Sequence, residues 1–408
     1  MAKDKDLKTP NVPPLRFPGF SDEWVKVSLG DIGETLIGLT YSPKDVVAND
    51  GTIVFRSSNI QDGMIDYTDL VRVNKPIKER IVTRENDILI CARNGSQRLI
   101  GKNALLTKAD EGNTFGAFMM IYRSDDNDVI HPILSTRRYI SQVSENLGAR
   151  INQITTSDLN SFEFYIPSNC IERRKIGKLF ALINERIATQ NKIIEDLKKL
   201  KSAIMVITFG KSNVTKNQWR EVRLGNICER VTRRNSNNIS NLILTIAAQY
   251  GLVSQIDFFN KSVASADLSN YYLLDKGDFA YNKSYSGEYT WGAVKRLDLY
   301  PQGVLSPLYI CFRPIEGIID SDFLVYLFES KCWYREVSEI CVEGARNHGL
   351  LNVSVVDFFN MKLHLPDLSE QKRIAEMMNA ISDKIEHSSQ LYALYNNQKT
   401  YLLSHMFI

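Results

Sequence analysis

The sequence predicts an α+β protein in which two similar globular domains are separated by two long helices that form an antiparallel coiled coil, an internal repeat with pseudo-two-fold symmetry. Three observations predict this fold class. A stretch near the start of the chain recurs just past its midpoint, alternating apolar residues close each copy, and a long segment with coiled-coil spacing follows each copy. A chain of 408 residues also exceeds the roughly 250–300 residues at which a single core stops growing, so more than one domain is expected.

The composition is that of an ordinary globular protein, with 44% hydrophobic and 24% charged residues. A net charge of only +3 requires any nucleic-acid-binding surface to be local. The six cysteines include no C-x-x-C pair and the five histidines no closely spaced pair, which favours reduced thiols and argues against a metal site. No apolar run has the length of a signal peptide or a membrane span. We therefore expect a cytoplasmic protein without membrane contact.

Each globular domain begins with the same motif. The stretch EWVKVSLGDI (Glu23–Ile32) matches QWREVRLGNI (Gln218–Ile227) without a gap, and tryptophan, leucine, glycine and isoleucine coincide. Further along, ENDILICAR (Glu85–Arg93) matches KGDFAYNKS (Lys276–Ser284), which predicts a strand followed by a polar loop in both copies.

A half-buried strand is predicted to close each domain. Apolar residues alternate in SDLNSFEFYIP (Ser157–Pro167) and in VDFFNMKLHLP (Val356–Pro366), and a proline ends both stretches. The predicted globular domains therefore occupy residues 1–168 and 210–366.

Long helices are predicted over residues 169–209 and 367–408. Their apolar residues are spaced alternately by four and three, an average of about 3.5 that indicates a coiled-coil seam. The alternative is that both are only amphipathic helices packed on a globular core. One helix leads into the second domain and the other leads away from it, so the simplest pairing is antiparallel. The predicted seam positions are Ile176, Phe180, Ile183, Ile187, Ile194 and Leu197 in the first helix, and Ile374, Met378, Ile381, Ile385, Tyr392, Tyr395 and Leu402 in the second.

Both helix starts have the sequence of a capping box. Asn169 precedes Glu172 by three residues, and Asp367 precedes Glu370 by the same interval. The stretch PDLSEQK (Pro366–Lys372) superficially resembles the Pro-Asp…Glu-x-Lys set of many nucleases. Its residues lie within one helix start, and the first copy lacks the aspartate, so we do not interpret it as a metal-dependent nuclease site.

A rod of this length suits a protein that reads two separate segments of DNA. About 38 helical residues at 1.5 Å each span roughly 55 Å, which is between one and two turns of a duplex that rises about 34 Å per turn. Because the two domains differ in sequence, the two half-sites are expected to differ as well.

Polar stretches at matching places in the two domains are candidates for DNA contact. Arg and Lys can bind guanine edges, Asn and Gln adenine edges, and all of them phosphates. Solvated turns are the alternative for each single stretch, but their recurrence in both copies favours binding. The candidate DNA-binding residues are Arg93, Asn94, Ser96, Gln97, Arg98, Lys102, Arg150, Asn152 and Gln153 in the first copy, and Arg233, Arg234, Asn235, Tyr281, Asn282, Lys283, Ser284, Tyr285, Arg346 and Asn347 in the second.

These motifs together resemble a known family. LRFPGF, EW…LGDI, NDILICARNGS and the helix EQKRIAEMMNAISDKI after a strand and a proline are similar to the specificity subunits of Type I restriction-modification systems. The resemblance covers nearly the whole chain. It implies target-recognition domains over residues 1–168 and 210–366, each reading one half of a split DNA sequence. It also implies that the conserved spacer helices 169–209 and 367–408 form the antiparallel coiled coil, set the gap between the half-sites and dock the methyltransferase subunits.

The same resemblance implies the partners. These are double-stranded DNA, two methyltransferase (modification) subunits and, for cleavage, restriction subunits. S-adenosylmethionine, ATP and Mg are expected in those subunits, and no cofactor is expected on this chain. The chain departs from the family pattern at FAYNKSYS (Phe279–Ser286), where many members have a small Gly-Ser turn.

No sequence motif supports catalysis by the chain itself. An adenine methyltransferase needs an Asn/Asp-Pro-Pro-aromatic loop, and the only Pro-Pro here is Pro13-Pro14, in the N-terminal tail. The stretch Gly95–Asn103 fails the phosphate-loop pattern, and a turn into a strand explains the matched Asp87 and Asp278. We therefore expect a non-catalytic chain. A protein-binding adaptor with two variable domains on a coiled-coil arm is the alternative from another class.

Overall fold

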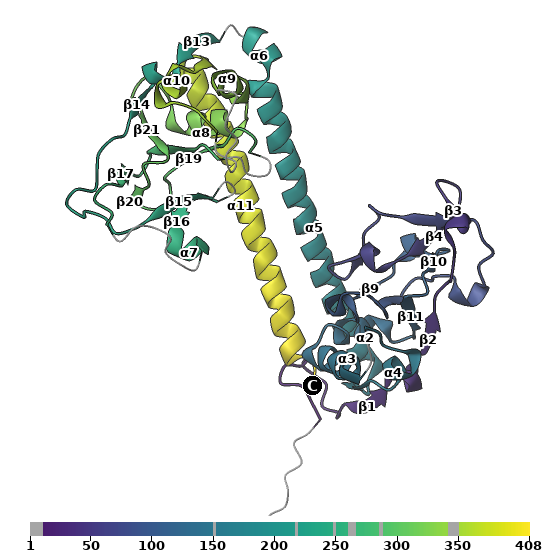
Figure 1. The fold of residues 1–408 in the computed structure, drawn as a ribbon. Coiled ribbons are helices and arrows are strands. Elements are labelled where there is room, and N and C mark those ends of the chain that lie inside the picture. Colours follow the sequence, from purple (N-terminus) through teal and green to yellow (C-terminus); the bar gives the residue numbers. More distant parts are fainter. Residues whose placement is uncertain are drawn as a thin grey trace, which may run out of the picture. The chain divides into compact units, whose positions relative to one another are not determined.

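The computed structural model describes residues 11–149, 152–216, 219–247, 250–259, 267–284, 289–341 and 351–408 (Figure 1). The chain divides into two compact units. Unit 1 comprises Met1–Asn191 with Gln390–Ile408, and unit 2 comprises Lys192–Ser389. Among the described residues, no helix has the length and apolar character needed to cross a membrane.

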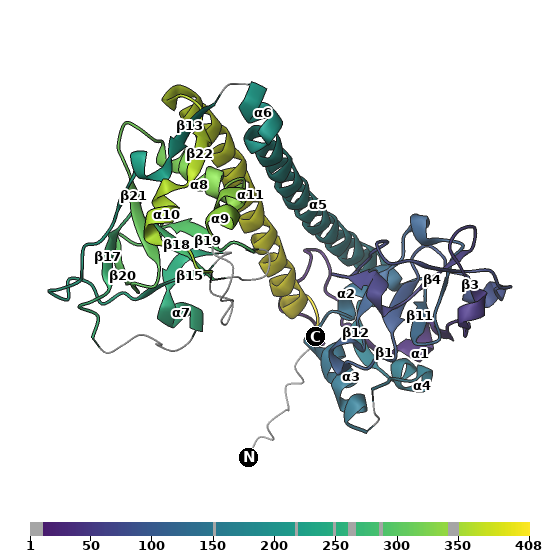
Figure 2. The same cartoon turned by 45° about the horizontal axis from the view of Figure 1, so that its top comes forward.

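The first and last strands of each repeat pair with one another. In unit 1, β1 (Val25–Ser28) runs antiparallel to β12 (Glu163–Ile166). In unit 2, β13 (Arg220–Arg223) pairs in the same way with β22 (Lys362–Leu365), and Figure 2 shows this pair close to the first turns of α11 (Leu368–His405). Strands therefore form in both of the closing stretches where apolar alternation predicts them.

A four-stranded antiparallel sheet with the same strand order lies at the centre of each unit. In unit 1 the order is β2 (Glu34–Ile37), β11 (Met119–Arg123), β8 (Ile88–Cys91) and β9 (Asn103–Leu105). In unit 2 it is β14 (Cys228–Arg230), β21 (Ile310–Pro314), β18 (Phe279–Asn282) and β19 (Ala293–Arg296). The two copies thus share one scaffold, as the sequence repeat predicts.

The copies differ in the strands added to this scaffold. Unit 1 has a second sheet and a small hairpin, formed by β3 (Val46–Val47), β4 (Thr52–Phe55), β7 (Val71–Val73) and β10 (Thr114–Phe115), and by β5 (Ile60–Gln61) with β6 (Met64–Ile65). Unit 2 has two ribbons instead, β15 (Leu244–Ala247) with β16 (Gly251–Ser254), and β17 (Tyr272–Asp275) with β20 (Gln302–Leu305).

Short helices connect the strands. The α-helices are α1 (Leu29–Ile32), α2 (Asn127–Ile133), α3 (Arg137–Ala149), α4 (Thr156–Asn160), α6 (Lys211–Lys216), α7 (Gln255–Phe259), α8 (Ser321–Glu329), α9 (Tyr334–Ile340) and α10 (Val355–Asn360). Single 3₁₀ turns are η1 (Pro43–Asp45), η2 (Ser57–Asn59), η3 (Glu79–Ile81), η4 (Gln97–Leu99), η5 (Lys108–Asp110) and η6 (Leu224–Asn226).

The central sheets are covered on both faces, which explains their continuous apolar strands. In unit 1, Ile88 and Ile90 pack with the helices, whereas Leu89 and Cys91 pack toward the second sheet. In unit 2 one face, which includes Phe279, packs against α8, α10 and the start of α11, and the other faces the added ribbons.

The two predicted long helices are confirmed as α5 (Cys170–Phe209) and α11. Every predicted seam position is buried or half-buried. The buried ones are Ile176, Phe180, Ile183, Ile187, Ile194, Ile374 and Met378, and the half-buried ones are Leu197, Ile381, Ile385, Tyr392, Tyr395 and Leu402.

The helices run in opposite directions within each unit. In unit 1 the ring of Phe180 lies 5.6 Å from that of Phe407, which follows α11, and Ile187, further along α5, lines a groove with Lys399, earlier on α11. In unit 2 the start of α11 and the end of α5 share one apolar core. The predicted antiparallel order is therefore confirmed inside each unit.

The helix starts are capped, but the predicted capping boxes do not close. Asn169 Oδ1 accepts from Ile171 N at 2.8 Å, and Asp367 Oδ1 accepts from Glu370 N at 2.9 Å. The carboxylate of Glu172 is instead buried against Arg16, at 2.6 and 2.8 Å. A paired guanidinium is a stronger partner for a carboxylate than a backbone N–H group, and this contact ties the N-terminal segment to α5.

Candidate nucleic-acid interface

The loop that follows β8 forms one wall of a cavity of about 900 Å³ in unit 1. Its residues Arg93–Gly95 meet Leu39–Tyr41, which follow β2, and Arg56–Ser58, which follow β4. The turn Gly116–Met119 and Asn152 complete the lining. The structure thus brings together three of the residues predicted to bind DNA, two in this loop and Asn152.

Arg93 is exposed at this cavity and is held by its backbone and its side chain. The N–H groups of Ala92 and Arg93 both donate to Phe118 O at 3.0 Å, and Arg93 forms an isolated antiparallel bridge with the half-buried Gln153. The guanidinium carbon of Arg93 lies 5.2 Å from the centre of the Phe118 ring, which is 59% exposed. This cation–π contact orients the guanidinium and leaves its N–H groups available to a ligand.

Asn94 has a different part in the loop. Its Oδ1 accepts from Ser96 N at 2.9 Å, which closes a local turn, and its Nδ2 donates to Ser57 Oγ at 3.0 Å. The amide group therefore holds the loop against η2, which follows β4, and Asn94 supports the position of Arg93 more than it offers a free amide edge.

The residues of this cavity that were not predicted from the sequence include Tyr41, Arg56 and Phe118. Arg56 Nη2 donates to Asp69 Oδ2 at 2.7 Å, while its buried Nε has no hydrogen-bond partner among the described residues. The signal for Phe118 is its place in FGAFMM, where the turn residues Gly116 and Ala117 precede an aromatic side chain at the start of a strand.

The remaining residues of the first polar stretch line a different groove. Gln97, Arg98 and Lys102 lie in a groove of about 530 Å³ with Lys399 of α11. The structure therefore divides the predicted polar stretch Arg93–Arg98 between two sites of unit 1. Ser96 is half-buried at the division.

In unit 2 the loop after β18 is joined to a distant segment by the same backbone contact as in unit 1, where Ile154 N donates to Ala92 O at 2.9 Å. Asn282 Oδ1 accepts from Ser284 N at 3.1 Å, and Leu351 N donates to Lys283 O at 2.7 Å. Asn282, Lys283 and Ser284 are half-buried. This loop corresponds to the one that carries Arg93.

Two predicted DNA-binding side chains of unit 2 belong to the interior. The Tyr281 hydroxyl donates to Trp291 O at 2.9 Å, and its ring is stacked on Phe358 at 4.6 Å. Asn235 is fully buried, donates through Nδ2 to Ser240 O and accepts from Ser240 N. Their assignment to a DNA-facing surface is corrected, because the polar groups of both side chains are satisfied inside the protein.

Arg233 and Arg234 are exposed, but both have intramolecular partners. Arg233 Nη2 donates to Asp275 Oδ1 at 2.6 Å. The guanidinium of Arg234 lies 5.0 Å from the Tyr272 ring centre and donates to Asn270 O. A DNA phosphate would have to compete with these contacts.

The other predicted residues lie outside the part of the chain that the structure describes: Arg150, Tyr285, Arg346 and Asn347. Within the described part, no group of three or more histidine, cysteine, aspartate or glutamate side chains is arranged to hold a metal ion.

Comparison with known proteins decides the family. The family model of the Type I restriction modification DNA specificity domain matches the chain twice, over residues 21–199 and 216–394. The chain belongs to this family. The EcoKI specificity subunit of Escherichia coli (strain K12) is 24% identical over 426 aligned residues, which cover 94% of this chain and 88% of that subunit. The StySPI specificity subunit of Salmonella potsdam is also 24% identical, over 89% of this chain and 83% of its own length.

A solved structure has the same fold. The crystal structure of the S subunit of a Type I restriction-modification system from M. genitalium superposes with a TM-score of 0.62 at 14% sequence identity. The alignment covers 97% of this chain and 99% of that subunit. The resemblance and the fold class stated from the sequence are therefore confirmed.

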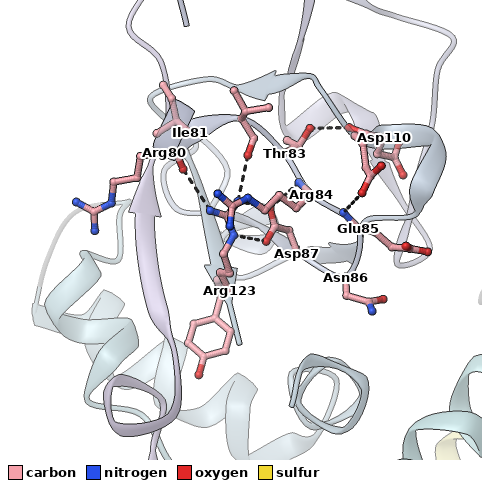
Figure 3. Close-up of polar contacts among 12 residues, drawn as sticks. Arg80, Ile81, Thr83, Arg84, Glu85, Asn86, Asp87, Asp110 and Arg123 are labelled. Carbon is pink, nitrogen blue, oxygen red and sulfur yellow. Dashed lines mark hydrogen bonds and ion pairs between the residues drawn. The ribbon is translucent and has the colours of Figure 1, made fainter. Parts of the chain in front are cut away.

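Both specificity domains contain a buried aspartate at the start of a central strand. In the first, Asp87 accepts from Arg84 N at 2.9 Å and is held by Arg123, with Nε at 2.7 Å and Nη2 at 2.6 Å (Figure 3). Arg123 also donates to the carbonyl groups of Arg80 and Val82, and these bonds fix the segment that leads into β8. This geometry assigns Asp87 to the scaffold.

The second specificity domain repeats this arrangement with one more acidic residue. Asp278 accepts from Asp275 N at 2.8 Å and from Arg313, with Nε at 2.6 Å and Nη2 at 2.8 Å. Burial opposes ionisation of the Asp275 carboxyl, but hydrogen bonds from Gln302, Arg233 and Arg313 outweigh it and lower its pKa. Arg233 is thus part of an ion-pair network that extends from the scaffold to the surface.

Each specificity domain also packs its first tryptophan on the end of a long helix that begins in the other unit. The ring of Trp24 lies 6.1 Å from that of Phe407, just after α11. The ring of Trp219 lies 6.1 Å from that of Phe209, the last residue of α5. The C-terminal residues therefore complete the core of unit 1 in the way that the end of α5 completes the core of unit 2.

Proposed function

We propose that this chain is the DNA-recognition subunit of a Type I restriction-modification complex and that each specificity domain reads one half of a bipartite target. The observation that carries this proposal is the duplicated specificity domain with a matched loop in each copy. Ala92 O accepts from Ile154 N in one copy, and Lys283 O accepts from Leu351 N in the other. The same backbone contact thus holds two loops with different side chains, which suits two different half-sites.

The cavity of unit 1 has the chemistry of base recognition. An arginine can donate two hydrogen bonds to guanine O6 and N7, and an exposed aromatic ring can contact a thymine methyl group. Arg93 and Phe118 supply these two groups side by side. Arg93 is therefore proposed to contact a base edge, and Phe118 to hold the guanidinium in position.

Catalysis is proposed to reside in partner subunits. Two modification subunits would dock on the spacer helices and transfer the methyl group, and restriction subunits would join them for cleavage in the cytoplasm. S-adenosylmethionine, ATP and Mg would be bound by those subunits. This chain would determine which DNA sequence is recognised, and α5 and α11 would set the gap between the two halves of that sequence.

The test is selection of DNA by the full chain copurified with its modification subunits. A random duplex pool is bound at low and at higher salt, and the retained duplexes are sequenced. We expect enrichment of two short motifs separated by a fixed gap, and affinity that falls linearly on a log–log plot against salt. One continuous motif, or binding without enrichment, would contradict the proposal.

A further inference from the structure

A groove in unit 2 carries several positively charged side chains. It has a volume of about 320 Å³ and lies where α5, β19 and the end of α8 meet. Among the described residues, those that line it include Lys198, Lys201, Lys295 and Lys331, together with the carboxylate of Glu329. Among the described residues of this groove, ammonium groups therefore outnumber carboxylates.

Two kinds of contact involve the ammonium groups of this groove. Lys201 Nζ lies 3.4 Å from Glu329 Oε2, so this carboxylate is already paired. Lys295 Nζ and Lys331 Nζ lie 5.8 and 5.0 Å from the centre of the same ring, that of Tyr289. A shared aromatic ring attracts both cations without supplying a negative charge of its own.

The environment of Lys295 reports the same imbalance. Burial lowers the pKa of its ammonium group, the Glu329 carboxylate opposes this change, and the neighbouring Lys201 and Lys331 lower the pKa further. An anion bound among these lysines would relieve the repulsion between them.

An equivalent groove exists in unit 1, the one lined by Arg98, Lys102 and Lys399. Both grooves are bordered by a glycine with a φ of +82°, Gly101 in unit 1 and Gly292 in unit 2. Each glycine carbonyl accepts a tyrosine hydroxyl, from Tyr139 at 2.8 Å and from Tyr334 at 3.0 Å.

The long helices supply a lysine at the same place in both grooves. Lys399 lies eight residues before Phe407, as Lys201 lies eight residues before Phe209, and these two phenylalanines have matching contacts with the first tryptophan of each domain. In unit 1, burial lowers the pKa of Lys399 and Asp62 opposes this change. Burial also lowers the pKa of His131 in this groove to about 4, so that its imidazole is neutral at pH 7 and adds no charge.

We propose that each groove binds phosphate groups of the DNA backbone, at a distance from the loops that read bases. The proposal rests on the function proposed above and deepens it. The base-reading loops differ between the copies, whereas the lysine from the long helix, the glycine turn and the tyrosine recur. Features common to both copies suit what is common to every DNA sequence, and lysine binds a phosphate as a compact point charge.

The test uses the full chain with its modification subunits and the double variant K198Q/K295Q. Affinity is measured for the target duplex and for a scrambled duplex over a range of salt concentrations. We expect both duplexes to bind about threefold to tenfold more weakly and the salt slope to fall by about one to two, with the preference for the target unchanged. The matched control is K199Q, an exposed lysine on the same helix outside the groove.

Binding by K198Q/K295Q with wild-type affinity and wild-type salt slope would overturn the proposal. Failure of the wild type to prefer any sequence would instead contradict the function proposed above, so the two failures are distinguishable. Should the double variant not fold, K198Q alone gives the same measurement, because Lys198 is exposed.

Inorganic tripolyphosphate tests whether the grooves bind phosphates of the DNA backbone or a free phosphate ligand. Thermal unfolding of wild type and of K198Q/K295Q is followed with increasing tripolyphosphate, and competition with the duplex is measured in parallel. If tripolyphosphate competes with DNA for the wild-type protein, and competes less well for the variant, the result supports a site for the DNA backbone. Stabilisation of wild type without any effect on DNA binding would overturn it in favour of a small phosphate ligand.

Discussion

Arg123 and Asp87 form a two-point ion pair that joins β11 to the start of β8, with Nε and Nη2 of the arginine 2.7 and 2.6 Å from the two carboxylate oxygens. The carboxylate is buried and the arginine side chain is only 16% exposed. Arg313 and Asp278 repeat the pair in the second specificity domain, but there the arginine is 48% exposed. The same contact is therefore better shielded from solvent in unit 1 than in unit 2.

Replacement of Asp87 by alanine is expected to lower the free energy of unfolding of unit 1 by about 3 kcal/mol, because it leaves a largely buried guanidinium without its partner. Urea unfolding of the full chain measures this change. Asp278→Ala should lower the free energy of unfolding by less, because water can solvate the half-exposed Arg313. Glu339→Ala, which removes an exposed pair with Arg335, is the control and should cost less than about 0.5 kcal/mol. Lost DNA recognition with unchanged stability would show that Asp87 has a functional role instead.

This pair shows which part of the scaffold the sequence reveals. The match between Asp87 and Asp278 is visible, and a turn at the start of a strand is inferred correctly, because both depend on neighbours in the sequence. The arginine comes from 36 residues away in unit 1 and 35 in unit 2, and no local pattern announces it. Period-two and heptad spacing likewise predict strands and helices, because those repeats arise from backbone geometry.

The candidate site is less predictable for the same reason. Tyr281 lies in a polar stretch, yet its ring points into the core because alternation along β18 places it on the face packed by α10. Phe118 lies in an apolar stretch, yet its ring is exposed because it occupies a turn. Whether a side chain faces a cavity depends on which segments from distant parts of the chain meet there, and spacing alone does not determine this.

Arg93→Ala is expected to weaken discrimination at one base of the first half-site by about 1–3 kcal/mol and to leave the second half-site unchanged. Arg93→Lys should keep the charge but lose the two-point contact. Relative to Arg93→Ala, it should therefore restore DNA affinity more than sequence specificity. Enrichment of a random duplex pool measures both effects. Arg84→Ala, an exposed arginine away from the cavity, is the control.

Phe118→Leu removes the ring beneath Arg93 and is expected to reproduce part of the Arg93→Ala loss, at about half its size or less, since a cation–π contact at an exposed site contributes roughly 0.5–1 kcal/mol. Thermal unfolding should be unchanged, because the ring is exposed. The double variant Arg93→Ala/Phe118→Leu should be no worse than Arg93→Ala. Additive losses would mean that Phe118 contacts DNA independently of Arg93.

His131 is expected to make unit 1 sensitive to acid. Burial lowers its pKa in the folded state to about 4, whereas the unfolded value is about 6.5. As the pH falls below 6.5 the unfolded state takes up a proton that the folded state does not, so the stability is complete above pH 6.5 and is lost progressively down to about pH 4. The expected loss between pH 7 and pH 5 is about 2 kcal/mol.

Urea unfolding at these two pH values tests this prediction by the difference between wild type and His131→Gln. Other groups contribute equally to both proteins, so the variant should lose about 2 kcal/mol less on acidification, whatever its stability at pH 7. His387→Gln, at an exposed position of α11, should behave as wild type does. An equal loss in wild type and His131→Gln would show that His131 does not couple folding to pH.

Insertion of one heptad into each long helix tests whether the spacer sets the gap between half-sites. The insertions follow Gln190 in α5 and Ser388 in α11, each one residue before the place where one compact unit ends and the other begins. Seven residues add about 10 Å of helix, so the gap should grow by about three base pairs at roughly 3.4 Å each. The half-site sequences should stay the same, because the contacts within each unit are retained. Insertion into α5 alone should disrupt the match between the two helices and weaken selection of any bipartite target. If duplex selection returned the original gap from the doubly lengthened chain, the half-sites would be positioned by something other than these helices.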